Sequence, residues 1–471
     1  MHEIPKRIGD PVTKFHLRNV PDQFNNEAGF NPSFMTRKLV LSGFLVLMSA
    51  LPVSSLLQAP ETPISKQDRD WLKQALHTVR DDIKKNYYDS TFHGLDVDRR
   101  FQEAEAKIDN ATNLNYGIAD IAGAVSALND SHTAFLPPAR PYLHDYGWRM
   151  QAEGDSDCFI TAVKPGSDAE KKGLKPGDQL LSVAGYAAIR DDAWKINYVY
   201  WILRPQLGLR IIVRSPDGTT RQLDTMAQMR RKGFDPWNWE EHLVNAIHRH
   251  QPRLEEYGKN AIIYQLPDFS FDPDRANEML DKIRGHQSLV LDLRGNPGGY
   301  AEFLARFLGG MFDHEVKIAD RLGRKPLHTS MTRSRGDKTF QGKLVVLIDS
   351  RSASAAELFA RIVQTEKRGT VIGDRSSGMV MESKLYPHQV YTKTGVVHYA
   401  VSITDANLIM ADGRSLEREG VIPDERIIPT AADLAAGRDP ALARAAELVG
   451  IRISPEQAGK LFPVQWPNDD E

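Results

Sequence analysis

Cysteine is nearly absent from this chain of 471 residues, in which Cys158 is the only one. A single cysteine excludes an internal disulfide framework, a metal site built from several cysteines, and a lipid-modified cysteine near the N-terminus. An excess of charge of one sign is also missing, since 60 lysines and arginines face 62 aspartates and glutamates and leave a net charge of −2. This balance gives no electrostatic reason to expect nucleic acid or an anionic membrane surface as a partner.

Two groups of catalytic motifs are missing as well. The 14 histidines include no His-Glu-x-x-His arrangement, and His248 and His250, two apart on a predicted helix, face different directions. No glycine-rich phosphate loop of the Walker type occurs either. We therefore expect no metal site, no bound nucleotide and no cofactor.

The first 59 residues carry targeting signals rather than the pattern of a folded domain. Residues 1–34 are polar and aperiodic, so they are a disordered leader or sequence upstream of a start codon placed too early. Residues 35–59 resemble a signal peptide, with Arg37 before a long apolar run. They predict an exported protein, periplasmic or extracellular. Residues 39–57 are about the ~20 residues that a bilayer span needs, so an uncleaved membrane anchor is the alternative.

Residues 60–145 are predicted to form a helical N-terminal domain, because their apolar residues recur at helical spacing. One of these helices is followed by a loop that holds Ser131 and His132. Functional side chains concentrate on loops, so this histidine is a candidate for chemistry.

Residues 146–230 change to short strands and glycine turns, such as Pro165-Gly-Ser167 and Lys175-Pro-Gly-Asp178. The order of these turns closely resembles a PDZ domain, although an ordinary small β-domain is the alternative. PDZ domains bind a peptide C-terminus as an added strand and hold its carboxylate on backbone N–H groups. By this resemblance, the carboxylate-binding loop is formed by four consecutive residues, Tyr146, Gly147, Trp148 and Arg149.

A helical connector is predicted over residues 231–260, with its helix around Trp237 to Glu256. Residues 261–430 then alternate strands with helices, and continuous apolar runs mark strands that are covered on both faces. The pattern predicts an α/β core, followed in residues 431–471 by a C-terminal helix and a polar tail. The expected core strands are 261–264, 289–293 and 344–348.

Ser354 stands where one of these buried strands runs through a small-residue turn into a helix. The start of a helix offers unpaired N–H groups and a partial positive charge, which favour an anion beside the serine oxygen. The alternative is structural, since Ser354 and Glu357 also have the spacing of a capping box. A second glycine-rich turn, ending in Gly298 and Gly299, could direct N–H groups at a tetrahedral oxyanion.

The order of these features along the chain is specific. PDZ-like sequence is followed by Asp292-Leu-Arg-Gly-Asn-Pro-Gly-Gly299, then by Ser352-Ala-Ser-Ala-Ala-Glu357, then by Glu417-Arg-Glu-Gly-Val-Ile-Pro-Asp424. The succession resembles the C-terminal-processing (tail-specific) serine protease family, which also includes the tricorn protease core. The resemblance implies an α+β / α/β multidomain protein whose core is a crotonase-like α/β protease domain.

The family pattern also implies roles for single residues. The middle serine of Ser-Ala-Ser-Ala is the nucleophile, which here is Ser354. The oxyanion hole comes from a glycine of the Asn-Pro-Gly-Gly loop, Gly298 or Gly299, and from the N–H that follows the serine, on Ala355.

One branch of the family pairs the serine with a lysine about 25 residues downstream, where this chain has Met379. A thioether cannot accept the proton, and nothing in the pattern places the nearby Lys384. The tricorn-like branch uses a histidine, the serine before it and a late glutamate, which here would be His132, Ser131 and Glu417. Glu419 is close enough in sequence to leave the choice of glutamate open.

The sequence therefore predicts a serine endopeptidase that hydrolyses exported polypeptides, with a PDZ module that binds peptide C-termini. The alternative is a catalytically inactive relative that uses the same fold to bind a peptide or a hydrophobic ligand. The missing lysine favours the alternative, whereas Ser354, His132 and the glycine loop together favour the enzyme. Polypeptides are the expected partners, and a membrane is expected only through the N-terminal anchor.

Overall fold

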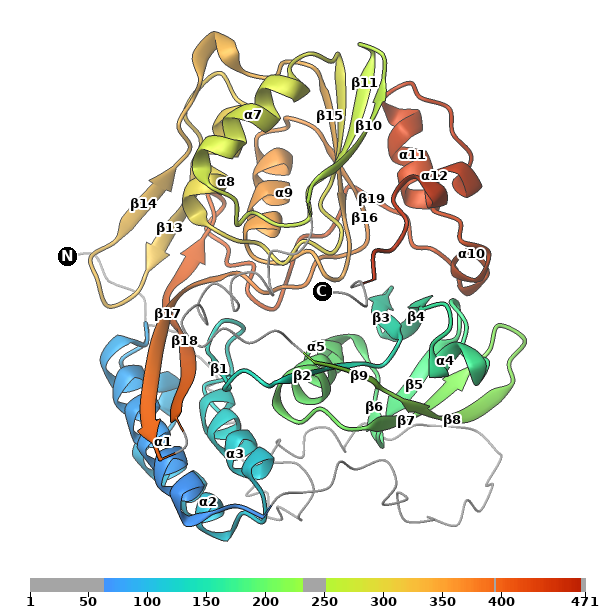
Figure 1. The fold of residues 1–471 in the computed structure, drawn as a ribbon. Helices are drawn as coiled ribbons and strands as arrows, with labels where there is room; N and C mark the ends of the chain where they lie inside the picture. Colours follow the sequence, from blue (N-terminus) through green and yellow to red (C-terminus); the bar gives the residue numbers. More distant parts are fainter. Residues whose placement is uncertain (1–62, 232–250, 394, 467–471) are drawn as a thin grey trace, which may run out of the picture.

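The computed structural model describes residues 63–231, 251–393 and 395–466. It confirms a helical N-terminal region, a PDZ-like β-domain and an α/β core (Figure 1). The expected leader and signal or anchor segment lie outside these described ranges. Within them, no helix has both the length and the apolar character that crossing a bilayer requires.

A six-stranded sheet forms the centre of the core. Five of its strands run parallel, and the sixth pairs antiparallel at one edge. In spatial order the strands are β10 (Arg253–Tyr257), β11 (Ala261–Gln265), β12 (Ser288–Asp292), β15 (Lys343–Ile348), β16 (Thr370–Gly373) and β19 (Glu425–Arg426).

Helices cover both faces of this sheet, which explains the continuous apolar runs of its strands. Side chains alternate between the two faces, so Leu289 and Leu291 enter one hydrophobic cluster and Val290 enters the other. The first cluster includes three helices, α7 (Pro273–Ile283), α8 (Ala301–Gly309) and α9 (Ala355–Thr365). The second includes α11 (Pro440–Leu448) and α12 (Pro455–Leu461), so the C-terminal helices complete the core.

The predicted connector helix is wrong in its last part. Residues 253–257 form the strand β10, whose Leu254 lies opposite Tyr264 of β11. Leu254 packs against the core while Glu255 and Glu256 are exposed, as suits an edge strand. Cross-strand pairing therefore outweighed the helical preference of the leucine and glutamates. The earlier part of the expected helix, residues 237–250, lies outside the described residues.

A long β-hairpin joins the core to the N-terminal helices (Figure 1). Its strands, β17 (Met381–Thr392) and β18 (Gly395–Ile409), belong to a second sheet with β1 (Ala134–Leu136), β13 (Lys317–Leu322) and β14 (His328–Met331). Val390 and Tyr399 of the hairpin pack into one cluster with the helical region. The helices of that region are α1 (Lys66–Asn86), α2 (Val97–Asn110) and α3 (Leu114–Ser126), with a 3₁₀ turn at Phe92–Gly94.

The PDZ-like domain has its own sheet and its own hydrophobic cluster. The sheet runs in the order β3 (Trp148–Glu153), β4 (Asp157–Val163), β5 (Gln179–Val183), β7 (Gly208–Arg214) and β8 (Thr220–Met226), with β6 (Tyr186–Ala187) beside β5. Among the described strands, β3 pairs only with β4, so β3 is one of the two edge strands of this sheet. Its helical elements are α4 (Asp168–Lys171), a 3₁₀ turn at Arg190–Asp192, α5 (Ala193–Asn197) and a π-helical turn at Tyr198–Leu203. A separate two-stranded sheet pairs β2 (Tyr142–Asp145) with β9 (Gln228–Arg231).

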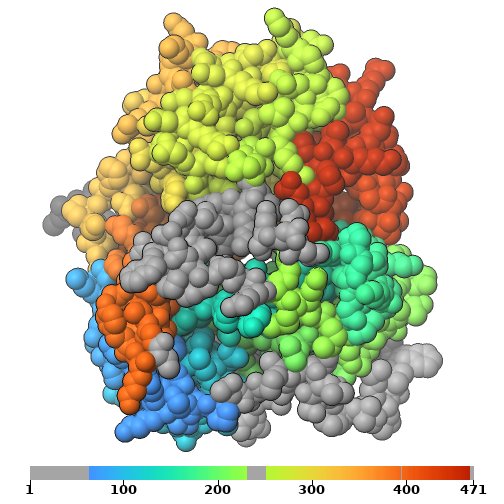
Figure 2. All heavy atoms as spheres, in the orientation of Figure 1, coloured from blue at the N-terminus to red at the C-terminus, as the bar shows by residue number. Residues whose placement is uncertain are grey.

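The PDZ-like domain is docked on the core through buried polar contacts. Arg190 forms an ion pair of 2.8 Å with Asp374, and both side chains are nearly inaccessible. The N–H of Gly154 donates to the same carboxylate at 3.0 Å, and the hydroxyl of Ser350 donates to the carbonyl of Ala152 at 2.6 Å. Figure 2 shows the C-terminal segment, which begins with α10 (Ala431–Ala436), at the junction of the two domains.

One buried carboxyl group at this junction makes the docking sensitive to pH. Burial, and then repulsion from Asp349 and Asp374, raise the pKa of Glu153 to about 8. A carboxyl group whose pKa is raised on folding stabilises the folded state, and this contribution is complete when the pH is below the pKa of the group in the unfolded chain. That stability is lost as pH rises through the folded pKa, here between about 4.5 and 8. Ionising Glu153 should therefore weaken the folded, docked state.

We expect the Glu153→Gln variant to escape this loss. A shift from 4.5 to about 8 corresponds to a penalty on the order of 5 kcal/mol at alkaline pH. The melting temperature should thus fall less between pH 5 and pH 9 in the variant than in the unmodified protein. Equal falls in both proteins would show that the pKa of Glu153 is not raised on folding.

Candidate active site

Ser354 lies at the carboxyl end of the parallel sheet, in the turn that joins β15 to α9. The glycine turn after the neighbouring strand β12 lies at the same edge, because parallel strands end on the same side. Ser354 has φ 53° and ψ −117°, a conformation that costs a non-glycine residue of the order of 1–3 kcal/mol. The turn therefore holds the serine in a strained position at the start of a helix.

The two glycines of the turn after β12 are packed too closely for any side chain. A Cβ on Gly298 would lie 2.6 Å from the Cβ of Ser354, and one on Gly299 would lie 2.3 Å from the backbone of Phe269. Asn296 holds this turn, since its buried side chain accepts the Gly298 N–H at 2.8 Å and donates to the carbonyl of Leu266 at 2.9 Å. The close approach brings the glycine backbone against the serine.

These contacts distinguish Gly298 from Gly299, the two glycines proposed for the oxyanion hole. The N–H of Gly298 is already donated to Asn296. Among the described residues, by contrast, neither the N–H of Gly299 nor that of Ala355 has a hydrogen-bond partner. Both Gly299 and Ala355 line the cleft beside Ser354. They are the two N–H groups still able to bind an oxyanion.

His132 comes from the N-terminal region and is held by its own loop. One carboxylate oxygen of Asp130 accepts the N–H of His132 at 2.9 Å and the N–H of Thr133 at 2.7 Å. The same oxygen accepts the hydroxyl of Thr404 on β18 at 2.7 Å. Strand β1, which begins two residues after His132, pairs with β18 and fixes the loop against the hairpin.

The structure brings Ser354, His132, Ser131 and Glu417 together in one hydrogen-bonded chain. The Nε2 atom of His132 lies 3.3 Å from the Oγ of Ser354, across 222 positions of sequence. On the other side of the ring, Nδ1 lies 2.7 Å from the Oγ of Ser131. Ser131 donates its hydroxyl to Glu417 at 2.7 Å and its N–H to the same carboxylate at 3.0 Å.

These partners determine which nitrogen of His132 carries the hydrogen. A serine hydroxyl has a single hydrogen, and Ser131 gives its hydrogen to Glu417. The contact between Ser131 and Nδ1 is then satisfied only if Nδ1 donates. Nε2 is left without a hydrogen and faces the hydroxyl of Ser354, which is the arrangement of a general base.

Burial changes the acidity of the two ionisable members of the chain. Burial lowers the pKa of His132 to about 4, with Asp130 acting in the opposite direction. Burial also raises the pKa of Glu417, while its hydrogen bonds from Ser131 and Val380 lower it. The imidazole is therefore neutral, and able to accept a proton, at ordinary pH.

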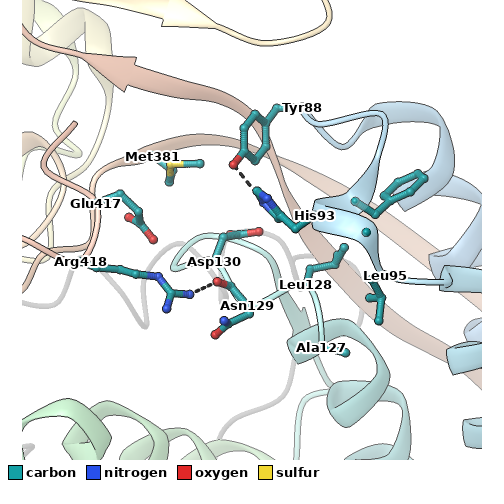
Figure 3. A pocket seen from close by; sticks show the side chains of 12 residues that line it. Tyr88, His93, Leu95, Ala127, Leu128, Asn129, Asp130, Met381, Glu417 and Arg418 are labelled. Carbon is teal, nitrogen blue, oxygen red and sulfur yellow. Dashed lines mark hydrogen bonds between the residues drawn. The ribbon is translucent and has the colours of Figure 1, made fainter. Parts of the chain in front are cut away.

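Ser354 and His132 open on a cleft of about 630 Å³. It runs between α8 and the strands β13 and β14, and its lining includes the apolar side chains of Leu304, Ile318, Leu358 and Leu408. A second cavity, of about 580 Å³, borders Glu417 from another side. Figure 3 shows Tyr88, His93, Asp130 and Glu417 turned towards one another around it, and Met381 lines both spaces.

The alternative bases and acids named from the sequence are placed elsewhere. Met379 is half-buried, and its carbonyl accepts the N–H of Ser354 at 2.9 Å. Lys384 forms an ion pair of 2.8 Å with Asp405 and does not line the cleft. Glu419 is exposed, whereas Glu417 contacts Ser131. The glutamate in contact with the serine–histidine pair is therefore Glu417.

The four residues of the expected carboxylate-binding loop have separate surroundings. Tyr146 and Trp148 are buried in the hydrophobic cluster of the PDZ-like domain. The N–H of Gly147 donates to the side chain of Asp145 at 3.0 Å. Arg149 contacts the C-terminal segment through the carbonyl of Gln465 and the ring of Trp466.

Two further residues beside the site, Asp130 and Glu357, have contacts that the sequence does not predict. Asp130 holds the backbone of the histidine loop, and an aspartate two positions before His132 is the signature of an Asx turn that could have indicated it. The spacing of Glu357 from Ser354 predicts a helix-capping role alone. Its carboxylate does accept the N–H of Ser354 at 3.0 Å, but it also binds a second loop that no local pattern reveals.

Comparisons with known proteins agree with this architecture. Residues 262–427 match the sequence model of Peptidase family S41, and residues 140–191 match that of the PDZ domain. The chain is 23% identical over 416 residues to the carboxy-terminal processing protease CtpA of Bacillus subtilis. The matched stretch covers 83% of this chain and 77% of that protein. It is 25% identical over 329 residues to the tail-specific protease of Haemophilus influenzae, covering 63% of this chain but only 43% of that longer protein.

A solved structure supports the fold. The crystal structure of mature CPAF superposes with a TM-score of 0.59 at 14% identity, covering 78% of this chain and 94% of that one. At this identity the likeness establishes the shared fold alone. Taken with the matched family models and relatives, it leads to one conclusion: the chain is similar to carboxy-terminal-processing and tail-specific proteases, with a segment that matches peptidase family S41 after one that matches the PDZ domain.

Proposed function

We propose that this protein is a serine endopeptidase in which Ser354 is the nucleophile and His132, in place of a lysine, is the general base. The observation that carries the proposal is the distance of 3.3 Å between Nε2 of His132 and Oγ of Ser354. Two separate regions of the chain meet at that contact. Methionine at position 379, where one branch of the family has lysine, leaves the imidazole as the base at hand.

In the acylation step, Oγ of Ser354 attacks the carbonyl carbon of the scissile bond and its proton moves to Nε2 of His132. The tetrahedral oxyanion is bound by the N–H groups of Gly299 and Ala355, and the start of α9 adds a favourable dipole. When the C–N bond breaks, His132 returns the proton to the leaving amine. The acyl group remains as an ester on Ser354.

Deacylation repeats these steps with water. His132 takes a proton from the water that attacks the ester carbonyl, and then gives it to Oγ of Ser354 as the ester bond breaks. Ser131 keeps the imidazole in its reactive tautomer. Glu417, acting through Ser131, supports the positive charge that develops on the ring in each half-reaction.

The substrates we infer are exported polypeptides, as the signal-like segment 35–59 suggests. We assign the PDZ module to binding peptide C-termini along β3, because that strand lies at an edge of its sheet. A free C-terminal carboxylate should therefore improve KM relative to an amidated peptide of the same sequence. Equal KM values for both peptides would remove this role from the module.

The test of the catalytic assignment is labelling with a fluorophosphonate, which modifies only an activated serine. We expect stoichiometric modification at Ser354 in the native protein, located by mass spectrometry of the digested chain. Hydrolysis of an unfolded polypeptide should be lost in proportion to the label. Ser350, in the same turn but bonded to the carbonyl of Ala152, is the internal control and should remain unmodified.

The same experiment separates the enzyme from its main alternative. A catalytically inactive relative that binds peptide or hydrophobic ligands would leave Ser354 unlabelled in the native state. Labelling that persists after heat denaturation would show reactivity unrelated to the site, and would also contradict the proposal.

A further inference from the structure

We propose that Glu357 is a positioning residue that ties the nucleophile turn to the loop Ser376–Val380, and through that loop to Glu417. This inference rests on the proposed function, since it concerns the residues that align Ser354 and His132. It goes beyond that function because Glu357 touches neither the substrate cleft nor the imidazole. Its side chain is fully buried, at 0% exposure.

Four hydrogen bonds converge on the carboxylate of Glu357. One oxygen accepts the hydroxyl of Ser376 at 2.6 Å and the N–H of Gly378 at 2.7 Å. The other accepts the N–H of Met379 at 3.0 Å and the N–H of Ser354 at 3.0 Å. A capping box accounts for the last of these bonds only, whereas three of the four fix a loop from another part of the chain.

The loop carries the connection onward to the base. The N–H of Val380, next in the chain after Met379, donates to Glu417 at 2.9 Å. The consecutive N–H groups of Met379 and Val380 thus donate to two different carboxylates. The first belongs to Glu357, which contacts Ser354, and the second belongs to Glu417, which contacts the serine beside His132. In addition, the carbonyl of Met379 accepts the N–H of Ser354 at 2.9 Å. The segment in which one branch of the family has its lysine serves here as the link between both halves of the site.

The chemistry of these contacts requires an acceptor on both oxygens. Three of the four partners are backbone N–H groups, which can only donate, and an ionised carboxylate satisfies all of them. A glutamine side chain has the same shape but replaces one oxygen by an NH₂ group. Whichever way the amide is turned, at least one N–H group, from Gly378 or from Ser354 and Met379, faces another donor inside the protein.

The experiment compares Glu357→Gln with the unmodified protein at a temperature below both melting transitions. We expect kcat to fall by about 10- to 100-fold, the size of effect that a small misplacement of catalytic groups produces. KM should change by less than about threefold, because Glu357 does not line the cleft. The fluorophosphonate labelling rate of Ser354 should fall with kcat.

Two further variants separate positioning from simple stability. Glu357→Asp keeps the charge on a shorter side chain and should recover part of the lost kcat. Asp68→Asn removes the carboxylate of a comparable capping box, in which Asp68 accepts the N–H of Ser65 at the start of α1. That control should lower the melting temperature while leaving kcat unchanged. If kcat fell as much in the control as in Glu357→Gln, the fall in kcat would be explained by lost stability, and the positioning role of Glu357 would be contradicted.

Hydrogen exchange tests the link independently of turnover. Amide hydrogens of residues 376–380 should exchange faster in Glu357→Gln, while those of the central strand β15 remain protected. An unlabelled wild-type protein would contradict the proposed function, and the exchange result would still decide whether Glu357 holds the loop. A labelled, active wild type beside an equally active glutamine variant would overturn the positioning role alone.

Discussion

Replacing Ser354 by glycine is expected to remove hydrolysis and, at the same time, to stabilise the fold. Without the nucleophile, covalent catalysis is lost. Turnover should fall by at least about 10⁴-fold, to the residual rate that substrate binding and the oxyanion hole still supply. Glycine adopts φ 53° and ψ −117° freely, so the strain that serine bears there is released. Against this gain stands the greater freedom of glycine in the unfolded chain, which costs about 0.4–1 kcal/mol.

The matched variant is Ser354→Ala, which removes the same hydroxyl but keeps the strain. Its hydrolysis should be lost equally, while its stability should stay close to that of the serine protein, because the hydroxyl makes no helix-capping hydrogen bond and the N–H of residue 354 still donates to Glu357. The melting temperature of the glycine variant should therefore lie above those of the serine protein and the alanine variant, measured by calorimetry beside the activity assay. An active alanine variant would contradict the nucleophile, whereas a glycine variant less stable than alanine would contradict the strain.

The main strands and the chemistry-bearing loops could be predicted from the sequence because their signals are local. The runs at 289–293 and 344–348 are apolar throughout since both faces of the sheet are covered, and turn residues follow each of them. The pairing of Ser354 with His132 came from a resemblance. Composition and spacing cannot bring together two residues that are 222 positions apart, because the contact depends on β1 pairing with β18.

What could not be predicted depends on partners remote in sequence. Glu357 has the spacing of a cap, and nothing near it indicates that Gly378 and Met379 donate to it. Arg190 resembles an ordinary surface arginine until its ion pair with Asp374 is seen at the domain junction. The strand β10 contains a leucine and two glutamates, which favour helices, and its strand conformation depends on pairing with the neighbouring β11.

Replacing His132 by alanine should cost about 10³- to 10⁴-fold in kcat, because the hydroxyl of Ser354 then loses its proton acceptor. Imidazole added to the assay should restore part of the activity, since the space left by the ring is the one that imidazole fits. Lys384→Ala is the control, because its ammonium is already paired with Asp405 at 2.8 Å. Loss of activity in the lysine variant, together with full activity in His132→Ala, would make the enzyme a serine–lysine protease.

The pH dependence should show that the base is buried, and it also reports on Glu357. Burial lowers the pKa of His132 to about 4 and raises that of Glu357 to about 7. As pH falls through 7, kcat/KM of the wild type should drop to the level of Glu357→Gln, because the neutral carboxyl group also loses acceptor capacity. It should then stay level and vanish near pH 4, where the imidazole is protonated and can no longer accept the serine proton.

The Glu357→Gln variant should show only the lower limb of this pH profile. A single limb at the ordinary histidine value of about 6.5 in both proteins would instead indicate a solvated imidazole, and with it a base other than the buried His132.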